Sequence, residues 1–216
     1  MVEILLLGEI FSLWLELKGV RMIHASAAVV DNSAIGFLST NNGGKSSLAG
    51  AFTQRGYPIL TDDIVPVEER HGLFIGRPGY PAMRMWPDQA EHFFGDYEDL
   101  EIVHPEYSKR RILIGPHHFG TFCSEEKSLK VIYMPQRLYS DSDITLEPLS
   151  KKKAFFELIQ NSFTAGIVEA LGLQPERMNF FTRMVTQVPV RRLSYPEGFH
   201  HLSHVVDAVL DDIDSL

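Results

Sequence analysis

FLSTNNGGKSSLA, residues 37–49, is the stretch from which the fold can be worked out. The apolar run 34–38 predicts a buried strand, and residues 46–54 predict a helix that ends near Gly56. A glycine-rich turn between a strand and a helix can bind an anion, because its N–H groups point inward and the helix N-terminus adds positive partial charge. The stretch therefore predicts a phosphate-binding loop.

The GGKS sequence at 43–46 matches the end of the Walker A pattern, G-x-x-x-x-G-K-[ST]. In that pattern Lys45 would reach the β- and γ-phosphates, and the Ser46 hydroxyl would bind Mg²⁺. Ser39 replaces the first glycine, but asparagine at 41 and 42 tolerates left-handed backbone, so the loop can still form. The alternative is a polar turn that contains the tetrapeptide by chance. The candidate nucleotide-binding residues are Asn41, Asn42, Gly43, Gly44, Lys45, Ser46 and Ser47.

A pair of acids follows the next predicted strand. Residues 58–61 are a short run that ends in Asp62 and Asp63. Adjacent carboxylates repel each other, and an acid at the end of a buried strand is costly unless a cation pairs with it. Mg²⁺ held by a nucleotide phosphate supplies that cation, and in P-loop enzymes a strand-end Asp contributes to the metal site. A polar turn after the strand is the plainer alternative.

His24 begins the strand that leads toward the loop. A histidine near an aspartate can tune the proton affinity and the orientation of that carboxylate. A purely structural role is the alternative for a His that precedes small residues.

Residues 77–87, RPGYPAMRMWP, predict a loop after the acidic pair. Such a loop either lines a substrate cleft or serves as a rigid connector. Tyr80 and Arg84 are its candidate substrate or phosphate contacts. Lys109 and Arg110 are further candidates, because basic residues near a phosphate site can neutralise transition-state charge. A solvated basic patch is their alternative.

Composition limits the class of protein. A chain of 216 residues favours a single domain, here residues 1–216, with a hydrophobic core large enough to be stable without disulfides or bound metals. Its 44% hydrophobic and 22% charged residues are ordinary for a soluble globular protein. The net charge of −8 argues against a general nucleic-acid binder. The single cysteine, Cys123, excludes an intrachain disulfide and favours a reducing compartment, so we expect a cytoplasmic protein.

The N-terminus is apolar but does not resemble a targeting segment. Residues 1–17 are rich in Leu and Ile, contain three Glu residues and have no basic start. A signal peptide needs a basic start, and a membrane span tolerates three acids poorly. We expect a mostly buried helix over 3–17 that stops near Gly19, or one side of an oligomer contact.

The rest of the chain predicts a mixture of strands and helices. Strands are expected at 24–30, 34–38, 58–61, 64–67, 73–76, 112–114, 129–134, 144–149 and 189–193. Helices are expected at 46–54, 87–94, 151–163, 175–186 and 202–213.

The order of these motifs resembles the catalytic core of HPr kinase/phosphorylase. The matching runs are HASA at 24–27, GGKSSLA at 43–49, RGY at 55–57 and LTDD at 60–63. PGYP at 78–81 and RMWP at 84–87 are similar to stand-alone HPr-kinase-like proteins, some of which act in lasso-peptide biosynthesis. The specific match covers residues 20–90, and a looser one runs through 188–193.

The resemblance implies an α/β fold related to the nucleotide-binding core of phosphoenolpyruvate carboxykinase, with a mixed sheet, a P-loop and flanking helices. It implies ATP and Mg²⁺ as cofactors and a homo-oligomer. It also implies roles: Asp62 as the catalytic base, His24 as its helper, Asp63 and Ser46 at the metal, and Lys45 as the phosphate clamp.

The chain departs from the family in two ways. Ser39 and Asn42 replace usual loop glycines, and the glycine-rich segment that shapes the protein-substrate site after the acidic pair is not recognisable. We therefore expect a serine kinase that acts on a peptide or small protein other than HPr, with a lasso-peptide precursor among the candidates. The alternatives are a nucleotide-binding regulatory module without turnover, which the altered loop favours, and a kinase for a small molecule such as free serine.

Overall fold

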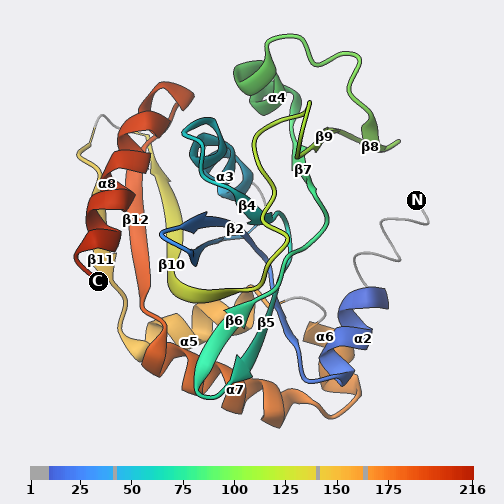
Figure 1. Cartoon of the computed structure of the whole chain (residues 1–216). Helices are drawn as coiled ribbons and strands as arrows, with labels where there is room; N and C mark the ends of the chain where they lie inside the picture. The colour runs from blue at the N-terminus through green and yellow to red at the C-terminus, as the bar shows by residue number, and fades with distance from the viewer. Residues whose placement is uncertain (1–9, 41–42, 140–141, 163–164) are drawn as a thin grey trace.

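The chain forms a mixed sheet with helices on both faces (Figure 1). The computed structural model describes residues 10–40, 43–139, 142–162 and 165–216. The strands of the large sheet are β1 (Arg21–Ile23), β2 (Ala25–Val30), β3 (Ser33–Leu38), β4 (Ile59–Thr61), β5 (Val65–Arg70), β6 (Leu73–Gly76), β10 (Lys127–Leu138), β11 (Thr145–Pro148) and β12 (Val190–Pro196). A smaller sheet contains β7 (Ala82–Met85), β8 (Ile102–His104) and β9 (Tyr107–Leu113). The helices are α2 (Phe11–Leu17), α3 (Lys45–Gln54), α4 (Pro87–Phe94), α5 (Lys151–Gln160), α6 (Ala165–Ala170), α7 (Gln174–Gln187) and α8 (Leu202–Asp214).

The large sheet confirms the predicted mixed α/β class. Its strands follow the order β1-β5-β6-β10-β3-β2-β4, with β12 and β11 branching from β10. β10 is parallel to β3 and to β12, whereas the other described pairings in this sheet are antiparallel. The hairpin β2–β3 places the end of β3 directly before the loop at 39–44, as the sequence predicts.

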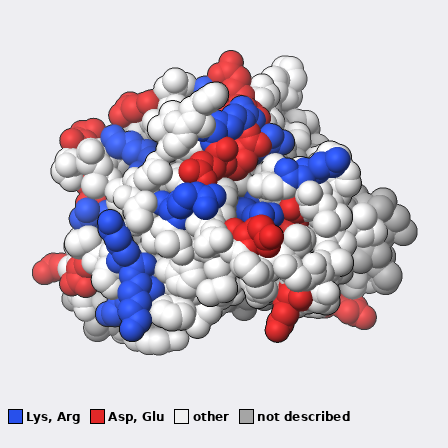
Figure 2. Space-filling view, turned by 90° about the horizontal axis from the view of Figure 1, so that it is seen from below, with Lys and Arg blue, Asp and Glu red and all other residues white. Residues whose placement is uncertain are grey.

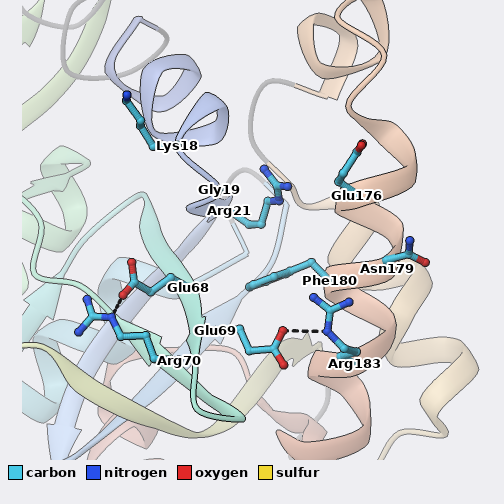
Figure 3. A pocket seen from close by; sticks show the side chains of 10 residues that line it. All are labelled: Lys18, Gly19, Arg21, Glu68, Glu69, Arg70, Glu176, Asn179, Phe180 and Arg183. Atoms are coloured by element: carbon cyan, nitrogen blue, oxygen red, sulfur yellow. Dashed lines mark hydrogen bonds and ion pairs between the residues drawn. The ribbon is translucent and has the colours of Figure 1, made fainter.

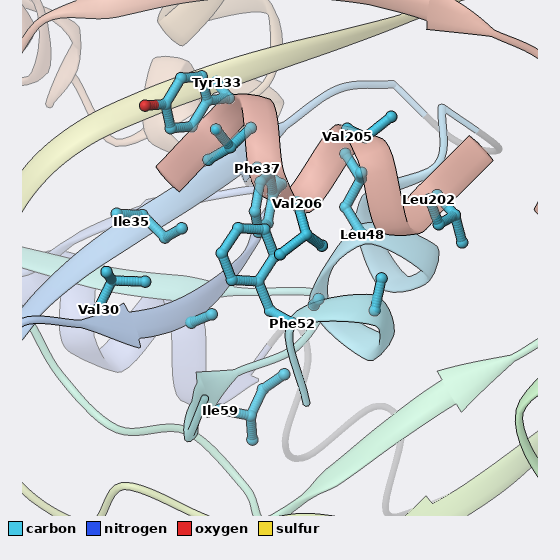
Figure 4. Close-up of a cluster of buried hydrophobic side chains, with 14 of the residues drawn as sticks. Val30, Ile35, Phe37, Leu48, Phe52, Ile59, Tyr133, Leu202, Val205 and Val206 are labelled. Carbon is cyan, nitrogen blue, oxygen red and sulfur yellow. The ribbon is translucent and has the colours of Figure 1, made fainter. Parts of the chain in front are cut away.

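Side chains alternate between the two faces of the sheet along each strand, and both faces of the central strands are buried. On β2, Ala25, Ala27 and Val29 face the cluster that α5 and α7 complete. Ala28 and Val30 face the opposite cluster, under α3 and α8. Figure 4 shows that second cluster, in which side chains of α3 lie between the sheet and α8. Fully burying one large side chain contributes about 1.5–3 kcal/mol, so this packing fixes α3, and with it the loop, against the sheet.

The small sheet corrects the expectation for residues 77–87. Residues 82–85 are not loop but strand β7, which pairs antiparallel with β9. Met83 and Met85 are fully buried in the cluster under α3, while Arg84 between them is only partly buried and lies on the other face. The alternation of apolar and polar residues was the signal of a strand, and the flanking prolines hid it. The strand expected at 112–114 is longer and begins at 107.

Helix α2 is less buried than the sequence suggested. The expected residues 3–9 lie outside the described part of the chain, and the helix found there spans Phe11–Leu17. Leu15 is buried, but Phe11, Trp14 and Leu17 are each about half exposed. The helix therefore presents an apolar face to the surface.

A buried ion pair cluster anchors α2 to α7. The Glu16 carboxylate contacts the guanidinium groups of Arg21 and Arg177, each at 3.0 Å. All three side chains are almost fully buried. Removing one partner of such a cluster leaves an uncompensated charge, which typically costs 3–5 kcal/mol. The contact fixes where α2 lies.

Most remaining elements match the predictions within a few residues. β10 is longer than expected at both ends, and α5 ends at Gln160, while the predicted end at 163 lies outside the described residues. The short elements β1, β8 and α6 were not predicted. Within the described ranges, no helix combines the length and apolar character needed to cross a bilayer. Figure 2 shows basic and acidic side chains interspersed on the face seen from below.

Candidate active site

The loop before α3 has the backbone that anion binding requires. Gly44 is the residue before the helix, with φ of 90°, and among the described residues no side chain caps the helix N-terminus. The N–H groups of the first turn are therefore available to an anion. A Cβ on Gly44 would lie 2.7 Å from the Tyr195 hydroxyl, and one on Gly43 would overlap the Ser39 side chain. Both positions thus need glycine for space, and Gly44 also needs it for its backbone.

Lys45 is held against the loop. Its Nζ donates hydrogen bonds to the carbonyls of Ser39 (2.8 Å) and Thr40 (3.1 Å). Burial lowers the pKa of Lys45, and the nearby charges of Asp63 and Asp62 oppose that shift. The ammonium therefore lies beside the loop and within the field of both acids. The candidates Asn41 and Asn42 lie outside the described residues.

Asp62 accepts hydrogen bonds from three donor groups. Ser26 Oγ and Ser46 Oγ donate to its Oδ1, at 2.5 and 3.0 Å, and the backbone N–H of Arg84 donates to Oδ2 at 2.9 Å. Burial and the adjacent charge of Asp63 raise the pKa of Asp62, although these hydrogen bonds act in the opposite direction. A cation at this position would therefore relieve a real electrostatic cost.

Asp63 is paired with a different set of residues. Nε2 of His24 lies 3.2 Å from Asp63 Oδ1, and an Nη1 of Arg84 lies 3.0 Å from Oδ2. Burial alone would raise the pKa of Asp63, but the His24 hydrogen bond and the Arg84 charge outweigh it and lower the pKa to about 2. Asp63 is thus ionised at any physiological pH.

The two aspartates diverge because of the backbone between them. Asp63 has φ of 75°, a left-handed conformation at the end of β4. The sequence paired His24 with Asp62 and Ser46 with Asp63. The structure instead brings His24 to Asp63 and Ser46 to Asp62. Nothing in the dipeptide itself signals which carboxylate points which way.

Two cavities adjoin this acidic pair and a third adjoins the loop, and we name them by what lines them. The loop cavity, about 40 Å³, is lined by His24, Gly43, Gly44, Lys45, Ser46, Asp63, Arg84, Trp86, Gln89 and Lys109. The Tyr195 cavity, about 120 Å³, is lined by Gly44, Ser47, Asp88, Arg137, Tyr195, Glu197, Gly198, Phe199 and Leu202. The α2 groove, about 380 Å³, is lined by Phe11, Leu15, Met22, Thr61, Asp62, Asp63, Ile64, Pro66, Pro78, Gly79, Tyr80, Ala82, Arg84 and Arg111.

The loop cavity is the middle one of the three. It shares Gly44 with the Tyr195 cavity, and it shares Asp63 and Arg84 with the α2 groove. A molecule whose phosphates lay on the loop could therefore extend toward Tyr195 on one side and meet a second molecule at Asp63 on the other.

The remaining sequence candidates divide among these places. Lys109 lines the loop cavity, with its Nζ 5.1 Å from the centre of the Trp86 ring. Tyr80 lines the α2 groove. The Ser47 hydroxyl accepts a hydrogen bond from Gln89 (2.7 Å). Arg110 instead faces the Tyr97 ring and donates to a carbonyl at residue 100, and it lines none of the three cavities.

Sequence reasoning missed several residues of the site. Ser26 bonds Asp62, and Gln89 links the Trp86 N–H to Ser47 across the first turn of α3. Ser26 lies two residues after His24, which the sequence placed on the same strand, and this spacing was the available signal, because residues i and i+2 of a strand share a face. In the structure His24 lies between β1 and β2, and Ser26 lies on β2. Gln89 lies far along the chain, on α4, and carried no signal.

The acidic pair fits a hard cation. Asp62, Asp63 and Ser46 present oxygen atoms, which Mg²⁺ prefers as ligands. Among the described residues, no group of three or more His, Cys, Asp or Glu side chains could hold a metal on its own. A magnesium ion here would therefore depend on nucleotide phosphates for part of its coordination, as is usual for this ion.

A larger cavity, about 610 Å³, lies away from the acidic pair (Figure 3). Its walls come from the turn after α2 and from β1, β5 and α7. Several of its charged side chains are paired with one another: Arg183 contacts Glu69 at 2.8 Å, and Arg70 contacts Glu68. Because these pairs already satisfy much of its charge, size alone does not make this cavity the better candidate site.

Comparisons with known proteins give a structural likeness but no sequence match. No protein-family model and no curated protein sequence matches the chain. The structure is similar to that of the HPr(Ser) kinase/phosphatase from Coxiella burnetii, with 12% identity and a TM-score of 0.46 over 89% of this chain and 95% of that one. A likeness at this level carries no argument about activity, so the function is inferred from the contacts and cavities of the site itself.

Proposed function

We propose that this protein is an ATP- and Mg²⁺-dependent kinase that phosphorylates a serine hydroxyl. The observation that carries the proposal is that Asp63 and Arg84 line both the loop cavity and the α2 groove. A kinase needs one carboxylate between the γ-phosphate and the acceptor hydroxyl. A protein that only binds a nucleotide needs no second cavity beyond the phosphates.

The donor would occupy the loop cavity and the Tyr195 cavity. The β-phosphate would lie against the N–H groups that follow Gly44, and the nucleoside would extend between Tyr195 and Phe199, whose aromatic rings suit a flat base. Lys45 would exchange its carbonyl partners for phosphate oxygens, a gain because charge-assisted hydrogen bonds are stronger than those to neutral carbonyls.

The contacts favour Asp62 with Ser46 as the metal-binding pair, the reverse of the family-based expectation for the two acids. The Ser46 hydroxyl already lies 3.0 Å from Asp62 Oδ1. Asp62 and Ser46 would hold a bound Mg²⁺, which would supply positive charge beside the phosphates during transfer. The raised pKa of Asp62 means that an unpaired negative charge is costly at this position, and a cation removes that cost.

Asp63 is then the base. The serine oxygen attacks the γ-phosphorus, the bond from phosphorus to the β-bridging oxygen breaks, and the hydroxyl proton passes to the Asp63 carboxylate. His24 holds the carboxylate through its 3.2 Å contact. A pKa of about 2 makes Asp63 a weak base, which suits a loose transition state in which the proton leaves late. Its main contribution is to orient the hydroxyl.

The proposal is tested by following ADP formation with Mg·ATP and a set of serine-containing peptides. We expect peptide-dependent turnover, and loss of at least 10²-fold in Asp63→Asn, the scale of a positioned base. Asp99→Asn is the matched control, because Asp99 is an exposed acid outside the site. Tight nucleotide binding without transfer to any peptide would contradict the proposal and favour a regulatory nucleotide-binding module.

A further inference from the structure

The α2 groove begins at the atoms where the proposed transfer takes place. Asp62 and Asp63 both line it, and Asp63 also faces the loop cavity. A molecule in the groove therefore reaches the acidic pair from the side opposite to the phosphates. This position suits the group that receives the phosphoryl, so the occupant must carry a hydroxyl at that end.

The size of the groove indicates what the rest of the occupant is. Its volume of about 380 Å³ falls in the range of sites for drug-sized ligands. The loop cavity beside it holds about 40 Å³. A free serine would leave most of the groove walls in contact with water, whereas an extended segment of a few residues would cover them.

Much of the groove lining is apolar. Helix α2 contributes Phe11 and Leu15, and the turn before β7 contributes Pro78 and Tyr80. Phe11 and Tyr80 are each about half exposed, so an incoming apolar side chain can bury more of both. The charged side chains of the lining are those of Asp62, Asp63, Arg84 and Arg111, and Arg84 contacts Asp63 at 3.0 Å.

We propose that the α2 groove binds the acceptor as an extended peptide segment, with an apolar side chain next to the phosphorylated serine. The serine hydroxyl lies at Asp63, and the neighbouring apolar side chain packs between Phe11 and Tyr80. This assignment rests on the proposed kinase function and adds the substrate class. It gives α2 the task of selecting the substrate, and the buried contacts of Glu16 hold the helix in place for it.

Blocked peptides of equal length test this assignment. Each contains one serine flanked by alanines, and one neighbour of the serine is changed to Leu, Asp or Lys, either before or after it. We expect the best Leu peptide to exceed the Asp and Lys peptides by about tenfold or more in kcat/KM, and free serine to be a far poorer acceptor. In Phe11→Ala and in Tyr80→Ala, KM for the Leu peptide should rise and the preference should shrink, with kcat nearly unchanged.

Leu17→Ala is the matched control, because Leu17 is an exposed apolar residue of the same helix that does not line the groove. Equal kcat/KM for the Leu, Asp and Lys peptides would overturn the groove assignment while leaving the kinase function intact. The groove assignment would also be overturned if the Phe11→Ala protein kept its preference for the Leu peptide but changed its oligomeric state. The groove would then bind a second copy of the chain. Failure to phosphorylate any peptide, despite nucleotide binding, would overturn the kinase function as well.

Discussion

The Asp63→Asn substitution tests the electrostatics of the site before any substrate is added. Asparagine keeps the shape of the side chain and tolerates the left-handed backbone that Asp63 adopts, with φ of 75°. It removes the charge that pairs with Arg84 and His24. Because these partners favour the ionised carboxylate in the folded state, the variant should be less stable than the wild type at neutral pH.

The magnitude follows from the pKa of Asp63, which falls from 3.8 to about 2 on folding, a shift of about 1.8 units. At 1.36 kcal/mol per unit, this sets a ceiling of about 2.4 kcal/mol. The side chain is 33% exposed, so solvent screening reduces the expected loss to about 1 kcal/mol. The folded-state pKa is the lower one, so this stabilisation is complete above pH ~4 and disappears as pH falls toward 2.

The assay is urea unfolding of the wild type and the variant at pH 7, 5 and 3.5, with Asp99→Asn as the control for loss of an exposed charge. The difference in unfolding free energy should be present at pH 7 and 5 and smaller at pH 3.5. An equal stability of the two proteins at pH 7, or a difference that grows on acidification, would refute this account of Asp63.

Three other substitutions follow from the same contacts. Lys45→Ala should weaken nucleotide binding by about 1–3 kcal/mol in calorimetry, the scale of lost charge-assisted hydrogen bonds, and unchanged affinity would exclude the phosphate role. Gly44→Ala should abolish nucleotide binding, because an alanine would be strained at φ of 90° and its Cβ would meet the Tyr195 hydroxyl. If adding Tyr195→Phe restored binding to this variant, the lack of space rather than the backbone strain would be the cause. Asp62→Asn should raise the Mg²⁺ concentration needed for nucleotide binding. In the wild type, Mg²⁺-dependent nucleotide binding should weaken as the pH falls, and it should do so at a higher pH than an ordinary Asp would require. The reason is that the pKa of Asp62 is raised and protons compete with the metal for its carboxylate.

The strand–loop–helix unit could be predicted because its signals are local. Residues 34–38, the glycines of the loop and the helix that follows are contiguous, and each pattern needs only its neighbours in sequence. The mixed sheet, which the family resemblance implied, is confirmed by the structure. The strand Ala82–Met85 was missed because proline and glycine around it dominated the interpretation, although Met83 and Met85 alternate as a strand requires.

The pairing within the site could not be predicted, because it depends on tertiary packing. Asp62 and Asp63 are adjacent in sequence, Asp63 adopts a left-handed backbone, and their partners Ser46 and His24 come from other segments of the chain. The groove was also inaccessible to sequence reasoning, since its two walls come from helix α2 and from the turn at Pro78, more than sixty residues apart. Tertiary packing alone brings these segments together.

Single-turnover transfer of phosphate from Mg·ATP to a serine peptide tests the central claim most directly, when it is measured beside nucleotide affinity in the wild type, Asp63→Asn and Asp62→Asn. The account predicts that Asp63→Asn binds Mg·nucleotide almost as well as the wild type but transfers phosphate at least 10²-fold more slowly. It predicts that Asp62→Asn loses Mg²⁺-dependent affinity. Transfer at the wild-type rate by Asp63→Asn would contradict the account.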